Sequence, residues 1–136
     1  MEQQLQHFAE GGESDDLMII YSDMHGLWGG VTITLSTDGA YERLERKRGA
    51  GVPDVIRSTV VPAHVRDVVR LLIEIKAWEQ RTPERVPVPD ESSATLTLRA
   101  GGVEASIWEW QNDLAKNARL ARVRGLLLEL AEADAA

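Results

Sequence analysis

The chain contains no cysteine in its 136 residues. This absence excludes disulfide bonds, thiolate metal ligands and a cysteine nucleophile, and with them several classes of enzyme. The chain also has no apolar run long enough to cross a bilayer, and its start, MEQQLQHFAE, has neither the basic region nor the apolar stretch of a signal peptide. We therefore expect a soluble, cytoplasmic protein that does not contact membranes.

Positive charge is scarce. The chain has 15 lysine and arginine residues against 22 aspartate and glutamate residues, which gives a net charge of −7 at pH 7. Because an acidic surface repels a phosphate backbone, we expect no nucleic-acid partner. The densest basic cluster, within residues 43–48, is interpreted as the charged edge of a hairpin.

The remaining composition is that of a folded protein. Hydrophobic residues make up 43% of the chain and charged residues 27%, and this length suits one hydrophobic core. Residues 1–14 are polar and end in EGGES, so we expect a flexible tail there. Residues 15–136 are expected to form a single domain.

Two stretches in the first half of the chain predict a hairpin. VTITL at 31–35 alternates between apolar and polar residues, AYERLERKR at 40–48 is the return strand, and Asp38 and Gly39 between them are a turn signal. With Gly39 in the left-handed region, Leu35 lies opposite Tyr41. LMIIY at 17–21 and VIRSTVV at 55–61 predict two more strands, and the first is apolar on both faces, as in a strand covered on both sides.

A second hairpin is predicted around Gly101 and Gly102. If these form a two-residue turn, Arg99 lies opposite Glu104 and the other cross-strand pairs also match in character. A shift of one residue would destroy that agreement. Alternate side chains of a strand point to opposite faces, so Trp108 and Trp110 share one face and Ile107 takes the other.

Two amphipathic helices complete the pattern. One begins at Pro62, and the other, from about Asn112 onward, has basic residues early and acidic residues late, against the helix dipole. Either this second helix begins nearer Leu120, or its arginines pair with acidic groups elsewhere. The expected buried stripes, in chain order, are Val65, Val68, Val69, Leu72 and Ile75, then Leu120, Val123, Leu127 and Leu130.

The order of elements, four strands, a helix, two strands and a helix, is typical of an α+β fold. We expect a two-layer sandwich in which an antiparallel sheet of about five to six strands carries two helices packed on one face. With the aliphatic residues of the second hairpin toward the helices, Trp108 and Trp110 point away from them. That face is either covered, by a loop or by a second copy in a homodimer, or offered to a foreign protein.

Two loops are candidates for partner contacts. Trp28 lies between glycines in the SDMHGLWGG stretch, and the proline-rich connection after the first helix contains Pro87 and Pro89. This connection is longer than most in compact domains, so it either crosses an end of the sheet or has a function.

Catalytic motifs find no specific match. There is no nucleophile elbow, phosphate-binding loop or dinucleotide glycine pattern, and we expect neither an enzyme nor a cofactor. The alternative is a small metal-assisted hydrolase or isomerase, whose site residues are Asp23, His25, Glu109 and Asp113. Glu109 also lies on the core side of its strand, and this position has two interpretations. The strand has reached the rim of the helix layer there, or the carboxylate is partly buried, with a raised pKa that suits a general base.

Three segments resemble a group of small bacterial domains related to emfourin. They are IIYSDMHGLWGGVTITLSTDG at 19–39, VVPAHVRDVVRLLIEI at 60–75 and PDESSATLTLRAGG at 89–102. Emfourin is a proteinaceous inhibitor of thermolysin-type metalloproteases. The resemblance implies the same layout of hairpins and helices, a protein-binding role, and contacts through the loops around Trp28 and residues 86–91.

We therefore interpret the chain as a non-catalytic protein-binding module. The expected partner is another protein, for which the resemblance names a metalloprotease, or a second copy of the chain in a homodimer of structural role. The contact residues proposed from the sequence are Trp28, Pro87, Pro89, Trp108 and Trp110.

Overall fold

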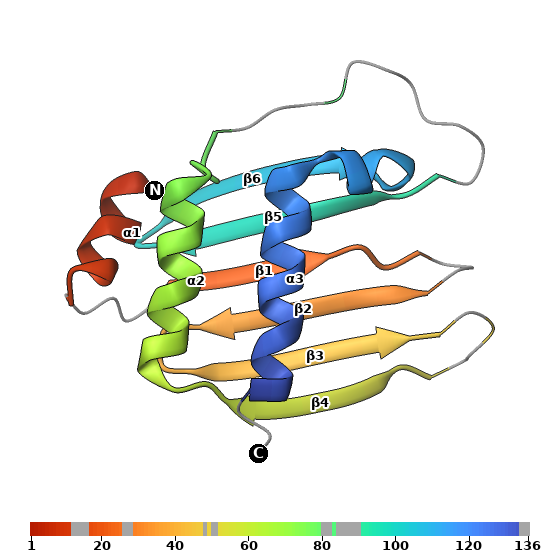
Figure 1. Ribbon diagram of the computed structural model, residues 1–136, viewed down its shortest axis with the longest axis horizontal. Helices are drawn as coiled ribbons and strands as arrows, with labels where there is room; N and C mark the ends of the chain where they lie inside the picture. The colour runs from red at the N-terminus through yellow and green to blue at the C-terminus, as the bar shows by residue number, and fades with distance from the viewer. Residues whose placement is uncertain are drawn as a thin grey trace.

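The computed structural model describes residues 1–11, 17–25, 29–47, 49, 52–79, 83 and 91–133. Six strands form one antiparallel sheet in the order β4-β3-β2-β1-β5-β6 (Figure 1). The strands are β1 (Met18–Ser22), β2 (Gly30–Ser36), β3 (Ala40–Arg46), β4 (Asp54–Thr59), β5 (Ser93–Ala100) and β6 (Val103–Trp110). The expectation of an α+β fold built on an antiparallel sheet is confirmed.

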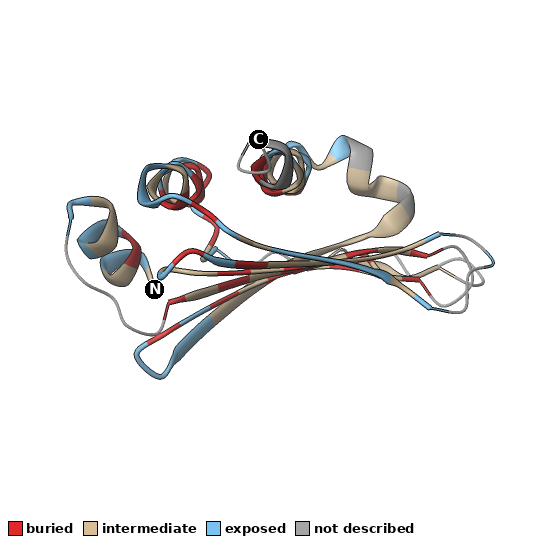
Figure 2. Ribbon diagram, turned by 90° about the horizontal axis from the view of Figure 1, so that it is seen from below, coloured by how far each residue is buried: buried red, intermediate tan, exposed pale blue. Residues whose placement is uncertain are grey.

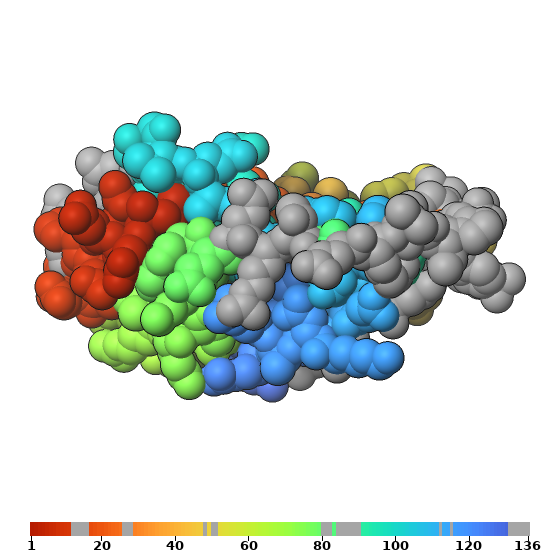
Figure 3. All heavy atoms as spheres, turned by 90° about the horizontal axis from the view of Figure 1, so that it is seen from above, coloured from red at the N-terminus to blue at the C-terminus, as the bar shows by residue number. Residues whose placement is uncertain are grey.

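Within the described ranges, three α-helices accompany the sheet, one more than expected. They are α1 (Glu2–Ala9), α2 (Pro62–Glu74) and α3 (Ala118–Ala133), and the 3-10 helix η1 (Gln111–Lys116) precedes α3. Viewed along the sheet, α2 and α3 lie side by side on the same side of it (Figure 2). In the space-filling view, α1 adjoins α2, and α2 adjoins α3 (Figure 3).

The hairpin of β5 and β6 has the predicted register. Gly101 and Gly102 adopt φ values of +54° and +78°, which L side chains rarely adopt. Arg99 pairs with Glu104 and Leu96 pairs with Ile107. The prediction is confirmed because a two-residue turn and the alternation of side chains specify the same register independently.

The hairpin of β2 and β3 also has the predicted register, with Leu35 opposite Tyr41. Gly39 has φ +92°, and a Cβ atom there would lie 2.4 Å from the carbonyl oxygen of Val60. The Val60 amide donates to the Gly39 carbonyl at 2.7 Å. This turn is therefore joined directly to the residue after β4.

The hydrophobic core lies between one face of the sheet and the helices. Every residue predicted for the two helical stripes is buried, and from the sheet Tyr21, Ile33 and Leu96 are fully buried. The Tyr41 hydroxyl donates to the Leu127 carbonyl at 2.8 Å, which ties β3 to α3. Burial of these apolar side chains supplies most of the driving force for the fold.

The expectation of a flexible tail over residues 1–14 is corrected for residues 2–9, which form α1. Leu5 is fully buried, and Met1 and Phe8 pack against the same core. These three apolar residues recur at helical spacing and lie on one face of α1. Because α1 packs beside α2 (Figure 1), the folded unit includes residues that the sequence assigned to a tail.

Both alternatives for the basic start of the last helix are confirmed. The α-helix begins at Ala118, where the Asn117 side chain accepts a hydrogen bond from the Leu120 amide at 3.2 Å, as an N-cap does. Three arginines of α3 pair with acidic residues on other elements: Arg119 with Glu79, Arg122 with Glu74 and Arg124 with Asp23. Their charges therefore join α3 to α2, to the residues after it and to β1.

Candidate functional site: the outer face of the sheet

The sheet face opposite the core, here called the outer face, consists of the side chains that alternate with the buried ones. No helix of the described residues lies on it (Figure 2). β1, β2 and β5 alternate strictly between buried and partly exposed residues, so the partly exposed set is the outer face. It carries Ile20 near its centre and many hydroxyl groups. The hydroxyl residues are Ser22, Thr32, Thr34, Ser36, Ser93, Thr95, Thr97 and Ser106.

Trp108 and Trp110 lie at the β6 margin of this face. Their ring centroids are 4.9 Å apart with an interplanar angle of 88°, an edge-to-face contact. This contact requires both indoles to lie on one side of β6, while Ile107, directly before Trp108, is buried in the core. The indoles pair across to Ser93 and Thr95 of β5, and each remains partly exposed.

Two ion pairs stand on opposite margins of the outer face. Arg57 of β4 contacts Glu42 of β3 at 3.0 Å, and Arg99 of β5 contacts Glu104 of β6 at 2.9 Å. The second pair follows from the predicted hairpin. The pair of Arg57 and Glu42 was not predicted, because the residues between β3 and β4 contain no turn signal that sets the register of these two strands.

A shallow hollow of about 380 Å³ opens on the outer face near the β3–β4 margin. The residues that line it include the small side chains of Ala40 and Ser36, together with Met18, Glu42 and Arg57. The outer face therefore offers a depression beside charged groups at one margin and large aromatic rings at the other.

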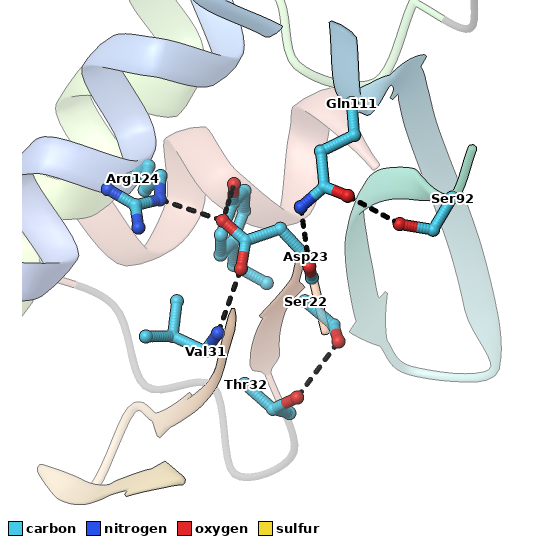
Figure 4. A network of polar contacts seen from close by, with 8 residues as sticks. Ser22, Asp23, Val31, Thr32, Ser92, Gln111 and Arg124 are labelled. Carbon is cyan, nitrogen blue, oxygen red and sulfur yellow. Dashed lines mark hydrogen bonds and ion pairs between the residues drawn. The ribbon is translucent and has the colours of Figure 1, made fainter. Parts of the chain in front are cut away.

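The residues proposed as a metal site are not brought together as one. In the described part of the chain, no three histidine or acidic side chains gather as a metal site would require. Asp23, with 3% of its surface exposed, accepts hydrogen bonds from the Tyr21 hydroxyl at 2.9 Å, the Val31 amide at 2.8 Å and Arg124 Nε at 2.8 Å (Figure 4). Both of its oxygens are engaged.

Asp23 therefore cross-links the end of β1 to β2 and α3. Its own carbonyl accepts a hydrogen bond from Gln111 Nε2 at 3.1 Å, and Gln111 in turn accepts one from the Ser92 hydroxyl at 2.6 Å (Figure 4). Burial, together with the negative charge of Asp23, raises the pKa of the Tyr21 phenol. The phenol stays protonated and serves as a donor.

Glu109 lies at the rim of the core and fixes the chain after β6. Its carboxylate accepts hydrogen bonds from the Trp110 amide at 2.9 Å and from Asn117 Nδ2 at 3.2 Å. His25 is buried, and its backbone pairs with Gly29. Asp113 lies in η1, on a separate hollow of about 520 Å³ that Glu109 and Trp108 also line.

Three of the proposed contact residues, Trp28, Pro87 and Pro89, lie outside the described residues. Trp108 and Trp110 are brought together on one face. No helix among the described residues is long and apolar enough to span a membrane. Comparison with known proteins finds no family model that matches the chain and no curated protein with a similar sequence.

Proposed function

We propose that the protein is a non-catalytic protein-binding module, and that its outer face is the contact surface. In this proposal α2 and α3 pack on one face of the sheet only, and the other face meets a protein. Trp28, Pro87 and Pro89 stay proposed contact residues on the sequence alone.

The observation that carries the proposal is the edge-to-face pair of Trp108 and Trp110, which stays partly exposed at the margin of a sheet face. Large aromatic side chains with a polar atom contribute much of the binding energy at protein interfaces. Around the pair, serine and threonine hydroxyls offer donors and acceptors to a partner without the desolvation cost of charges.

The distribution of charge supports the same proposal. The strand residues of the outer face carry three arginines, Arg46, Arg57 and Arg99, and two glutamates, Glu42 and Glu104. Since the whole chain has a net charge of −7, the excess acidic charge lies on other surfaces. A nearly neutral face does not repel an approaching protein.

The resemblance to emfourin-like domains names a class of partner to test, a thermolysin-type metalloprotease. The chain is titrated from nanomolar concentrations into such a protease that is cleaving a quenched fluorogenic peptide. We expect saturable inhibition, and we expect the inhibition constant to rise at least about tenfold in the double variant Trp108→Ala/Trp110→Ala because interface tryptophans are frequent hot spots.

The matched control is Arg70→Ala, which removes an exposed side chain of α2 away from the outer face. It should inhibit as the unchanged chain does. Equal inhibition by the tryptophan double variant would contradict the assignment of the outer face as the contact surface. If the chain does not inhibit the protease even at micromolar concentration, about 100 times what a tight inhibitor needs, the protease is contradicted as the partner.

A further inference from the structure

The outer face has different side chains at its β4–β3 margin and at its β5–β6 margin, and they can be compared row by row. A row here means the residues joined by cross-strand pairs from β4 to β6. One row contains Val55, Leu44, Thr32, Ser22, Thr95 and Trp108. Its β4–β3 end is aliphatic, with Val55 48% exposed, its centre is hydroxylated, and its β6 end is aromatic.

The charged residues have a similar arrangement. At the β4–β3 margin the pair is Arg57 on the outer strand and Glu42 on the inner one; at the β5–β6 margin it is Glu104 on the outer strand and Arg99 on the inner one. The order of charge from the edge inward is thus reversed between the two margins. A surface with this pattern is complementary to itself after a half-turn.

We propose that the occupant of the outer face is a second copy of this chain, packed face to face about a twofold axis that runs along the strands between β2 and β1. The proposal rests on the proposed function, in which this face contacts a protein, and it names the partner. The axis places β4 of one copy over β6 of the other, β3 over β5 and β2 over β1.

This axis matches the apolar ends of the face. Trp108 of one copy lies over Val55 of the second copy, next to Leu44, because all three residues share one row. In the centre, Thr32 then faces Ser22, while Thr34 faces Ile20 and Ser36 faces Met18. Aligned packing of two sheets in this way is the usual geometry of a β-sandwich.

The same axis matches the charges. Arg99 of one copy lies over Ala40 of the second copy, above the hollow that Glu42 also lines. Glu104 lies over Thr59 of the second copy, one row from Arg57, and these long side chains can bridge the row offset of about 7 Å along the strands.

A twofold axis across the strands does not give these matches. It sets each strand over itself with the rows inverted, so that Arg57 faces Val55 of the second copy and Trp110 faces Glu104. The flat footprint of the face is about 700 Å², from six strands about 4.8 Å apart and about seven residues with a rise of about 3.4 Å each. This is close to the roughly 800 Å² that each partner buries in a standard interface.

The test uses charge swaps that keep each internal ion pair but reverse its direction. The first variant is Arg99→Glu/Glu104→Arg, and the second is Glu42→Arg/Arg57→Glu. In either variant alone, like charges face each other across the interface. Mixed together, the two variants restore opposite charges at both contact regions of a heterodimer.

The molar mass of the full chain is measured by light scattering during size exclusion, with sedimentation equilibrium for the dissociation constant. The unchanged chain should have twice its 15.1 kDa mass. Each variant alone should dissociate at least about tenfold more readily, and an equimolar mixture should recover the doubled mass. Circular dichroism checks that each variant is folded.

A monomeric unchanged chain would overturn the inference, as would a dimer whose dissociation constant in both variants equals that of the unchanged chain. Neither result bears on the proposed function, because protease inhibition is measured at nanomolar concentrations and with its own tryptophan variants. A chain that does not inhibit the protease, but forms a dimer that the charge swaps weaken, would contradict the protease as partner. The inference of the dimer would stand.

Discussion

At the scale of single residues, the carboxylate of Asp23 accepts hydrogen bonds from Tyr21, Val31 and Arg124. Its sequence position, two residues from His25, suggested a metal ligand, and the structure makes it a buried cross-link between β1, β2 and α3. Nothing local in SDMHG distinguishes the two roles. The partner that decides between them, Arg124, is about a hundred residues away along the chain, so spacing alone could not find it.

Replacing Asp23 with alanine should lower the free energy of unfolding by about 2–4 kcal/mol. The substitution leaves the Val31 amide, the Tyr21 hydroxyl and Arg124 without their acceptor in a buried or half-buried place. Denaturant unfolding measures the change. The control is Glu74→Ala, which breaks an exposed pair with Arg122 and should cost less than about 1 kcal/mol. Equal losses in the two variants would refute the cross-link.

Tyr21 gives the fold a dependence on high pH. Burial, with Asp23 beside it, raises the pKa of the folded phenol above its ordinary value of 10.0. Above pH 10 the unfolded chain loses this proton while the folded chain keeps it, so the stabilisation present at neutral pH falls as pH rises. The expected slope is about 1.4 kcal/mol per pH unit for this group.

Unfolding in urea at several pH values between 9 and 11.5 measures that slope. Tyr41, whose pKa burial also raises, contributes a slope of its own. Tyr21→Phe should therefore show a shallower decline than the unchanged chain, and an identical decline in the two chains would rule out a contribution from Tyr21.

At the scale of elements, the two glycine turns show what the sequence determines. Gly101 and Gly102 close β5 and β6 with a loop of two residues, so register follows from local geometry. The pairing of β1 with β5 joins strands about 75 residues apart, and no local signal predicts it. The sheet order, and with it the rows of the outer face, therefore required the structure.

The same distinction explains the missed helix α1. Within α1 only Leu5, Phe8 and Ala9 pack on the core, among polar neighbours, and the surface that buries Leu5 belongs to other elements. A short isolated helix is marginal in water, so its existence depends on tertiary contacts. The helical stripes of α2 and α3, in contrast, are repeated over several turns and were predicted residue by residue.

Gly39→Ala should cost about 2–3 kcal/mol or more, and Gly101→Ala about 1 kcal/mol. Both positions have positive φ, which disfavours alanine. At Gly39, however, the new methyl group would also lie 2.4 Å from the Val60 carbonyl, while at Gly101 it meets nothing within 4 Å. Thermal unfolding of the two variants compares them; a smaller loss at Gly39 would contradict the described contact between this turn and the residue after β4.

At the scale of the whole molecule, the excess acidic charge lies away from the outer face, which carries the aromatic pair of Trp108 and Trp110. The chain carries a net charge of −7, yet the outer face is nearly neutral, with an aliphatic margin and an aromatic one. Two copies joined through this face would keep their acidic surfaces apart and facing solvent. The aromatic margin was predicted from the sequence, while the aliphatic margin that complements it depends on β4 lying at the opposite edge.

The most direct test of the outer face as a contact surface is collisional quenching of Trp108 and Trp110 at increasing protein concentration. Trp28→Phe and Trp78→Phe are introduced so that only these two indoles emit, and acrylamide is the quencher. We expect strong quenching of these two indoles at nanomolar concentration and a drop in the quenching constant as the chain associates. A constant that is low at every concentration would show that the indoles are covered within one chain, which contradicts the outer face as a contact surface. A constant that stays high would show that no second copy covers the indoles, which contradicts the dimer.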